Sequence, residues 1–484
     1  MSDTIEGHWV RLTYSENKFT IRNDRLGLRS LYWLTTPSAI IISSRLDWIS
    51  KYACGLKIDF PNLGSRWLLF NQLTYDCPIE GVKRLGPGGK LEIANGVTRY
   101  SDSPFLPTPG RKYEPEKIVE RLRRYATPAM GENLCASLGL SGGLDSRVLL
   151  SLLLTSNTQK FTTHTFGNNA DPDVSIPQRI SRELRIPHVV YDAQIPSVSE
   201  VIALFRDYIA QTNLVEPIST VLRLRHYHGL DQNSQFLIDG GFGEVARRQY
   251  LNRLMLNGAK AIENRSIAVI RNSLRAHRGG IFNDDVNQVM LAGADREIMQ
   301  MLESMPPLSS MNIEDYLDLW AVRTRIPNFS SDEQARMDST IVNYMPFAQP
   351  GFIDDVFTMP LRYRRNGAFL RSLIGSLCAP LKRYPLVKNN TTYPFILPTY
   401  GAWIWSKAKA RFGHQYRDES THVFLHSIQE YVMDVLHSQD TKQYAPYDYP
   451  IIQKNVTEYY RGNRSLSNQV NWWLSFDLWR RNFT

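Results

Sequence analysis

Cysteine is scarce in this chain, with four residues in 484. Cys54, Cys77, Cys135 and Cys378 are far apart and show neither a disulfide framework nor metal-site spacing, which predicts reduced thiols and a cytoplasmic location. The polar N-terminus has no signal-peptide core. The longest apolar run, residues 148–154, is too short to cross a bilayer, so no membrane partner is expected.

Extreme charge is also missing. A hydrophobic content of 43% and a charged content of 21% are those of an ordinary globular chain, whose length suggests roughly two or three domains. The net charge of +9 is dispersed, and no long basic run indicates a nucleic-acid partner. The sequence has no Gly-x4-Gly-Lys-Ser/Thr string, which excludes a Walker-type phosphate loop.

The chain does contain a glycine turn between a predicted strand and a predicted helix. Its sequence, Ser-Gly-Gly-Leu-Asp-Ser, follows an apolar run at residues 134–140 and precedes an apolar helical pattern. Such a connection points backbone N–H groups and a helix dipole at one anion, and glycine allows close approach of the backbone. The expected anion-binding residues are Ser141, Gly142, Gly143 and Ser146.

Asp145 is the unusual member of this loop, because a carboxylate repels a phosphate unless a cation bridges the two. The combination predicts a nucleotide polyphosphate held with magnesium, with Asp145 as the metal ligand. A simpler interpretation is a plain strand-to-helix turn in which Asp145 caps the first helical turn. The apolar strand and the complete six-residue string favour the nucleotide.

This string, residues 141–146, resembles the pyrophosphatase loop of the N-type ATP pyrophosphatases, and with its surroundings it is similar to the asparagine synthetase family. The resemblance implies that ATP is split between its α- and β-phosphates and that the loop holds pyrophosphate. It implies a synthetase domain over residues 111–484, with an α/β fold of the adenine nucleotide alpha hydrolase type and a helical C-terminal part.

The pattern of residues in this region independently indicates a doubly wound parallel sheet. Strands predicted at residues 160–167, 187–191 and 235–239 alternate with helical patterns. Ligands of such sheets bind at the carboxyl ends of the strands, and the motifs identified here fall at those ends.

Residues 1–110 have a β-rich pattern, with a hairpin signal at residues 90–100. Residues 22–32 (Arg-Asn-Asp-Arg-Leu-Gly-Leu-Arg-Ser-Leu-Tyr) resemble a segment in the second half of glutamine amidotransferase domains. The first half has no counterpart, and Ser2 rather than a cysteine follows Met1. The resemblance implies a smaller, truncated amidotransferase-like domain without glutaminase activity; a wrongly assigned start codon is the alternative.

The end of the predicted strand 160–167 also resembles the family. Thr165, Phe166 and Gly167 match its adenine and ribose contact, although an aromatic residue at a strand end is equally often part of a core. Asp173 matches the acidic position of the family's Pro-Asp segment, and a helix N-cap explains it equally well.

Residues 239–245 (Asp-Gly-Gly-Phe-Gly-Glu-Val) resemble the family's Ser-Gly-x-Gly-x-Asp-Glu-Val segment. The resemblance implies that Gly241 belongs to the ATP site and that Glu244 assists amide formation. Gly243 stands where the family has a magnesium-binding aspartate, a loss that Asp239 or Glu244 could compensate.

Lys388 matches a family lysine that neutralises the charge of the α-phosphate and pyrophosphate, with a solvated surface lysine as the alternative. Tyr344 stands where the family has an arginine. The aromatic-rich stretches 393–407 and 470–479 are predicted to be packing faces of helices.

Together these features predict an asparagine-synthetase-like, AMP-forming carbon–nitrogen ligase with ATP and Mg²⁺ as cofactors. A small-molecule or peptide carboxylate would become an acyl-adenylate, and ammonia or an amine would displace AMP. Glu244 and Lys388 are the expected catalytic residues. A partner protein or a homodimer is allowed for. The alternatives are a nucleotide-binding scaffold with a weakened magnesium site, and another pyrophosphatase-loop reaction such as thiolation or argininosuccinate-type ligation.

Overall fold

The computed structural model describes residues 5–53, 55–128, 135–156, 160–192, 194–232, 235–388, 390–413 and 416–483. Within these ranges an α/β unit contains a five-stranded parallel sheet in the order β10-β9-β8-β11-β12. The strands are β8 (Cys135–Gly139), β9 (Phe161–Phe166), β10 (His188–Tyr191), β11 (Gln235–Ile238) and β12 (Asn343–Tyr344). The predicted parallel α/β sheet is confirmed; the part of the first predicted strand at Leu134 lies outside the described residues.

Apolar strands and an apolar helix form the core around this sheet. Leu138 and Ile238, neighbours in the register of β8 and β11, are fully buried. Helix α4 (Leu144–Leu154) is apolar almost all round, as expected of a helix buried on most sides. The run that is too short to cross a bilayer is therefore a core helix.

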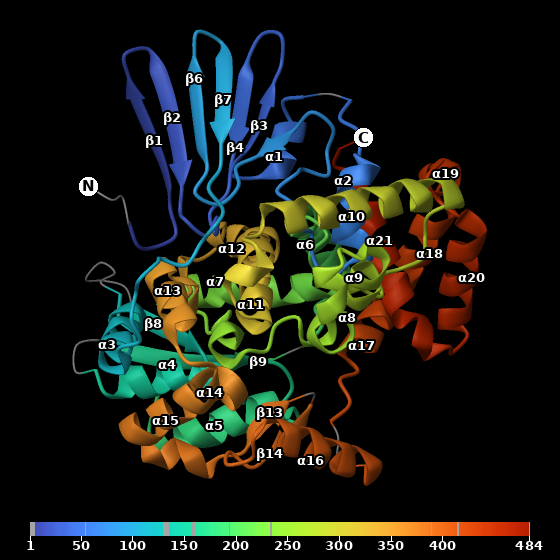
Figure 1. The fold of residues 1–484 in the computed structure, drawn as a ribbon. Helices are drawn as coiled ribbons and strands as arrows, with labels where there is room; N and C mark the ends of the chain where they lie inside the picture. The colour runs from blue at the N-terminus through green and yellow to red at the C-terminus, as the bar shows by residue number, and fades with distance from the viewer. Residues whose placement is uncertain are drawn as a thin grey trace.

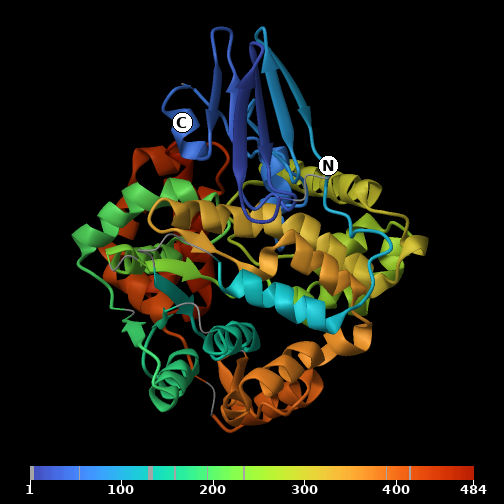
Figure 2. The same cartoon turned by 90° about the vertical axis from the view of Figure 1, so that its left-hand side faces the viewer.

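The first hundred residues form two antiparallel sheets, with strand orders β1-β2-β6-β7 and β4-β3-β5. Figure 1, and Figure 2 from a second side, show these strands projecting from one end of the molecule, above the helices. Their bounds are β1 (Val10–Ser15), β2 (Lys18–Asn23), β3 (Tyr32–Thr35), β4 (Ile40–Ser43), β5 (Lys83–Arg84), β6 (Lys90–Ala94) and β7 (Val97–Ser101). The strands expected here and the hairpin at residues 90–100 are present, while a separate β-rich, amidotransferase-like domain stays a prediction.

The remaining described elements are mostly helices. Helix α10 lies between the N-terminal strands and the helices below them in Figure 1. The helical bounds are α1 (Leu46–Ser50), α2 (Phe60–Leu68), α3 (Pro115–Ala126), α5 (Pro172–Leu184), α6 (Val198–Tyr208), α7 (Leu224–Gln232), α8 (Asn252–Glu263), α9 (Ile267–Leu274), α10 (Asp284–Ser304), α11 (Ile313–Arg325), α12 (Ser331–Asp338), α13 (Pro350–Thr358), α14 (Leu361–Arg364), α15 (Ala368–Leu377), α16 (Thr399–Arg411), α17 (Ser420–Ser427), α18 (Gln429–His437), α19 (Gln439–Gln443), α20 (Tyr449–Tyr460) and α21 (Ser467–Arg480). The short hairpin β13 (Leu386–Lys388) and β14 (Thr391–Tyr393) lies with α16 at the opposite end of the molecule from β1.

Two glycines bring helices α2 and α10 into backbone contact. A Cβ on Gly64 would lie 2.2 Å from the carbonyl oxygen of Met290, and one on Gly293 would lie 2.0 Å from that of Pro61. Neither position can carry a side chain unless the helices separate. The contact joins the N-terminal segment to the helical body.

The two aromatic stretches differ in their environment. The packing face predicted for residues 470–479 is confirmed, because Trp473 and Trp479 on α21 are fully buried. The prediction for residues 393–407 holds at Phe395, which is buried, and is wrong for α16, where Tyr400 and Trp403 are 71% and 47% exposed. Both segments are rich in aromatic residues, and the presence or absence of neighbouring elements decides whether those residues are buried.

Cys77, Cys135 and Cys378 are free thiols, and Cys54 lies outside the described residues. Among the helices that are described, none has both the length and the apolar character needed to cross a membrane.

Candidate active site

The predicted site residues after β8 and β11 meet where the strand order of the sheet reverses. Strands β8 and β11 are neighbours, and the chain moves away from them in opposite directions, to β9 and to β12. Loops at such a point diverge and leave space for a ligand at the carboxyl ends of the strands. The two segments are in contact here, since a Cβ on Gly240 would lie 3.3 Å from the backbone nitrogen of Ser146.

The loop after β8 is closed by its own hydroxyl groups. The backbone N–H of Ser141 donates to Oγ of Ser146 at 3.1 Å, and that of Gly143 donates to Oγ of Ser141 at 3.1 Å. The two hydroxyls are 3.0 Å apart. Helix α4 follows without a side-chain cap from any described residue. Ser141 and Ser146, which were expected to donate hydrogen bonds to a ligand, therefore also hold the loop in its shape.

Asp173 contacts the same loop from the start of α5. Its Oδ1 accepts the backbone N–H of Gly142 at 2.9 Å, and burial raises the pKa of its carboxyl group. The helix is capped instead by Asp171, whose side chain accepts the backbone N–H of Asp173. The N-cap interpretation of Asp173 is wrong, because its side chain turns to the loop.

Asp145 is paired with an arginine. Its Oδ2 lies 2.5 Å from Nη2 of Arg247, and the two side chains are 13% and 16% exposed. Burial raises the pKa of Asp145 to about 6, opposed by the charge of Arg247 and reinforced by that of Glu244. The other oxygen, Oδ1, is buried and has no hydrogen-bond partner in the described structure. Asp145 does not cap α4, so the simpler interpretation of this residue is wrong.

Gly243 is the residue against which Asp145 packs. A Cβ at this position would lie 2.4 Å from Cγ and 2.7 Å from Oδ1 of Asp145. No side chain fits there while Asp145 keeps its position. An aspartate at position 243 would therefore displace Asp145 from the place where it pairs with Arg247.

Lys388 reaches the loop through strand β13. The backbone N–H of Val387 donates to the carbonyl oxygen of Gly142 at 3.0 Å. A Cβ on Gly142 would lie 2.2 Å from Cγ2 of Val387, so packing as well as ligand access requires glycine here. Lys388 is half-buried, and burial together with the nearby charge of Arg247 lowers its pKa.

A second buried arginine joins the loop to this hairpin. Arg147, fully buried on α4, donates to the carbonyl oxygens of Tyr384 at 2.8 Å and Gly142 at 3.1 Å. Sequence reasoning assigned no role to Arg147, although an arginine inside an otherwise apolar helix is a signal of a buried polar contact.

Phe166 lies in a cluster of aromatic rings. Its ring is stacked on His226 with centroids 5.4 Å apart, and Tyr191 and Tyr227 are each at 5.4 Å. Thr165 donates from its hydroxyl to the carbonyl oxygen of Leu140 at 2.8 Å. Both interpretations of Phe166 stay open, because the ring is half-buried and packed by protein side chains. Gly167 at the strand end has φ +135, in the range that favours glycine.

Glu244 and Asp239 extend the site along the end of β11. Glu244 Oε2 accepts the hydroxyl of Tyr250 at 3.1 Å. Asp239 Oδ1 accepts the backbone N–H of Gly241 at 2.8 Å, and burial raises its pKa, with a contribution from Glu244. Burial and nearby carboxylates also raise the pKa of Glu333, on α12, to about 8. Sequence reasoning missed Glu333, since nothing local places α12 beside β11.

Tyr344, which stands at the position of the family arginine, stacks on His8 at 5.4 Å. A ring in that place cannot make the charged contact of an arginine. This departure from the family pattern is therefore a difference in chemistry.

A protein-bound magnesium ion does not fit these residues. Over the part of the chain that the structure describes, no group of three or more histidine, cysteine, aspartate or glutamate side chains could hold a metal ion. Asp145 offers one unpartnered oxygen, and its other oxygen is taken by Arg247. Mg²⁺ prefers several oxygen ligands in a near-octahedral arrangement. The ion could reach this site only with its own phosphate ligands.

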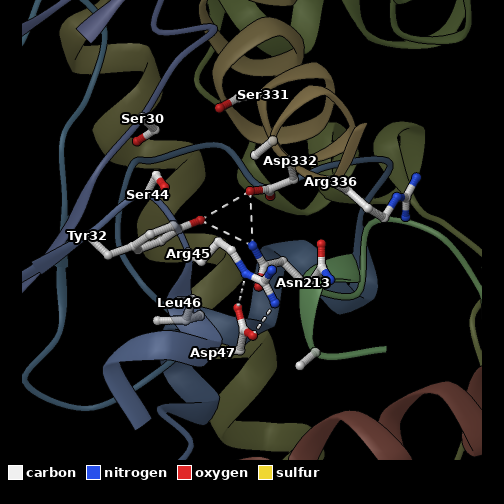
Figure 3. A pocket seen from close by; sticks show the side chains of 13 residues that line it. Ser30, Tyr32, Ser44, Arg45, Leu46, Asp47, Asn213, Ser331, Asp332 and Arg336 are labelled. Atoms are coloured by element: carbon white, nitrogen blue, oxygen red, sulfur yellow. Dashed lines mark hydrogen bonds and ion pairs between the residues drawn. The ribbon is translucent and has the colours of Figure 1, made fainter. Parts of the chain in front are cut away.

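Three cavities in the described part of the chain lie away from this loop. Two of about 570 and 640 Å³ and one of about 20 Å³ adjoin the N-terminal segment, and residues 141–146 line none of them. Figure 3 shows the cavity of about 20 Å³, where Tyr32 and Asn213 both donate to Asp332 Oδ1 at 3.1 Å. The hydrogen bond between Tyr32 and Asp332 at this cavity connects β3 to α12. The candidate site is thus defined by its side chains and its place in the sheet.

No protein-family model and no curated protein matches the chain. Among solved structures, the chain is similar to the NMN synthetase from Francisella tularensis, with 16% identity and a TM-score of 0.22. That similarity covers 56% of this chain and 94% of the other.

Proposed function

We propose that this protein is an ATP-dependent carbon–nitrogen ligase of the asparagine synthase type, with an adenine nucleotide alpha hydrolase fold over residues 111–484. The observation that carries the proposal is the meeting of two segments at the switch point of the sheet. The loop at residues 141–146 and the segment 239–245 come from different strands, and both were singled out by the same resemblance.

The reaction has two steps. A carboxylate oxygen attacks the α-phosphorus of ATP, the bond between the α- and β-phosphates breaks, and pyrophosphate leaves. The nitrogen of ammonia or an amine then attacks the acyl carbon, loses a proton, and AMP leaves with the electrons of the C–O bond. Magnesium enters as the counter-ion of the ATP substrate, since the protein offers it no complete ligand set.

The proposed roles follow the geometry of the site. Pyrophosphate lies against the loop, and Lys388, held beside the loop by β13, stabilises the leaving charge. Glu244, positioned by the hydroxyl of Tyr250, accepts the proton from the amine. The nucleotide-binding set comprises Ser141, Gly142, Gly143, Asp145, Ser146, Thr165, Phe166, Gly167 and Gly241.

The substrates proposed are ATP, a small-molecule or peptide carboxylate, and ammonia or an amine. Residues 1–110 would be an amidotransferase-like β-rich domain, and ammonia would come from solution or from a partner. A cytoplasmic location belongs to the same proposal.

A nucleotide-binding scaffold is the second candidate. The pairing of Asp145 with Arg247 favours it, because a neutralised carboxylate holds a metal ion less well. In that case ATP would bind and would not be split.

One assay separates the two candidates. The full chain is incubated with labelled ATP, Mg²⁺ and a panel of carboxylates with ammonia, and AMP and pyrophosphate are measured. We expect both products with at least one carboxylate, and at least a tenfold loss in Asp145→Ala. The control is Asp434→Ala, an exposed aspartate on α18, which should behave like the wild type. ATP binding without any AMP would support the scaffold, and absence of ATP binding would overturn both candidates.

A further inference from the structure

We propose that Arg247 is a polyphosphate-binding residue that takes the place of a protein-bound metal ion beside Asp145. This inference rests on the proposed function and specifies how the same site holds its phosphates. The guanidinium of Arg247 lies 2.5 Å from Oδ2 of Asp145, where a cation bridging carboxylate and phosphate would be needed.

Gly243 and Arg247 form one structural arrangement. They begin and end the single 3-10 turn Gly243–Arg247 after β11. A side chain at position 243 would collide with Asp145, whose Cγ would be 2.4 Å from the new Cβ. Glycine thus leaves room for Asp145 to turn toward Arg247. The loss of a carboxylate and the presence of an arginine four residues later are then two parts of one change in the site.

Arg247 has a hydrogen-bond donor left for a ligand. Its Nη1 donates to Oε1 of Gln249 at 3.0 Å, while its Nε is buried and unpartnered in the described structure. Burial acts to lower the pKa of Arg247, but the nearby carboxylates Asp145 and Glu244 outweigh it and raise the pKa, so the guanidinium remains charged. A buried donor of a charged group without an acceptor is costly, and a phosphate oxygen would satisfy it.

A second cation lies on the same side of the loop. Lys388 is close enough to Arg247 for the charge of that arginine, together with burial, to lower its pKa. Its strand, β13, is hydrogen-bonded to the loop through Val387 and Gly142. Arg247 and Lys388 are two cations at this site, and the carboxylates of Asp145 and Glu244 balance their charge when no ligand is bound. Guanidinium and ammonium groups bind phosphate oxygens without a metal ion. The ligand class is therefore a polyphosphate, bound whether or not a divalent cation accompanies it.

The test measures pyrophosphate binding without turnover. Isothermal titration of sodium pyrophosphate into the full chain is done first in EDTA and then in Mg²⁺. We expect the wild type to bind in EDTA, and Arg247→Gln to bind at least tenfold more weakly. Adding Mg²⁺ should restore part of the binding in the variant, because Asp145 is freed for the metal ion. Arg253→Gln, an exposed arginine on α8, is the matched control.

Two further measurements keep the result interpretable. Arg247→Lys retains the charge and should bind better than Arg247→Gln, and circular dichroism melts of all variants check folding. If the wild type binds pyrophosphate only with Mg²⁺ and Arg247→Gln binds equally well, this inference is wrong while the proposed function stands. If the wild type binds pyrophosphate under neither condition, the proposed function fails as well.

Discussion

Glu297 makes the stability of this protein depend on pH in a direction opposite to that of most carboxylates. It is fully buried on α10, where its Oε2 accepts from Oγ of Ser65 at 2.6 Å and from the backbone N–H groups of Leu73 and Thr74 at 3.2 and 3.1 Å. Burial raises its pKa from 4.5 to about 7, against those hydrogen bonds. The folded state therefore binds the proton more tightly than the unfolded chain does.

The sign and size of the effect follow from linkage. Stabilisation by the protonated group is complete below pH 4.5 and is lost as the pH rises through about 7. A tenfold change in an acid constant corresponds to about 1.4 kcal/mol, so the whole effect is on the order of 3 kcal/mol. Most of it, about 2.5 kcal/mol, falls between pH 5 and 8.

Urea unfolding of the wild type and Glu297→Gln at several pH values between 5 and 8 tests this prediction. Glutamine keeps an acceptor for the three donors and cannot ionise, so its free energy of unfolding should lack this pH-dependent part. Relative to the wild type, the free energy of unfolding of the variant should rise by about 2.5 kcal/mol from pH 5 to pH 8. Glu303→Gln, an exposed glutamate on the same helix, is the control. Equal pH dependence in the wild type and Glu297→Gln would refute the reasoning.

Two glycine substitutions test other contacts. Gly293→Ala places a Cβ 2.0 Å from a carbonyl oxygen on α2, so the free energy of unfolding should fall by about 1–3 kcal/mol in urea. Gly280→Ala, whose Cβ would meet nothing within 4 Å, should be neutral, and equal losses in both would contradict the packing argument. Gly142→Ala should displace Val387 and with it Lys388, and weaken pyrophosphate binding at least tenfold; Val387→Ala in the same chain should recover part of it. Unchanged binding in Gly142→Ala would show that β13 does not position the lysine.

Local sequence determined the elements that carry the site. Residues 141–146 sit between an apolar strand and an apolar helix, and short-range periodicity together with glycine is enough to specify such a connection. The same holds for the alternating strands and helices of the sheet and for the hairpin at residues 90–100. These features depend on neighbours a few residues apart, which a single sequence displays.

Only the tertiary structure decided which side chains act on Asp145. The sequence showed that an aspartate was missing at Gly243 but not that Arg247 would pair with Asp145, because the two segments are joined by the packing of β8 on β11. Asp173 and Lys388 likewise reach the loop through strands and helices distant in sequence. Ion pairs and burial depend on distances between elements, and hydrophobic patterns leave those distances undefined. The loop was therefore predictable, and the charges around it were not.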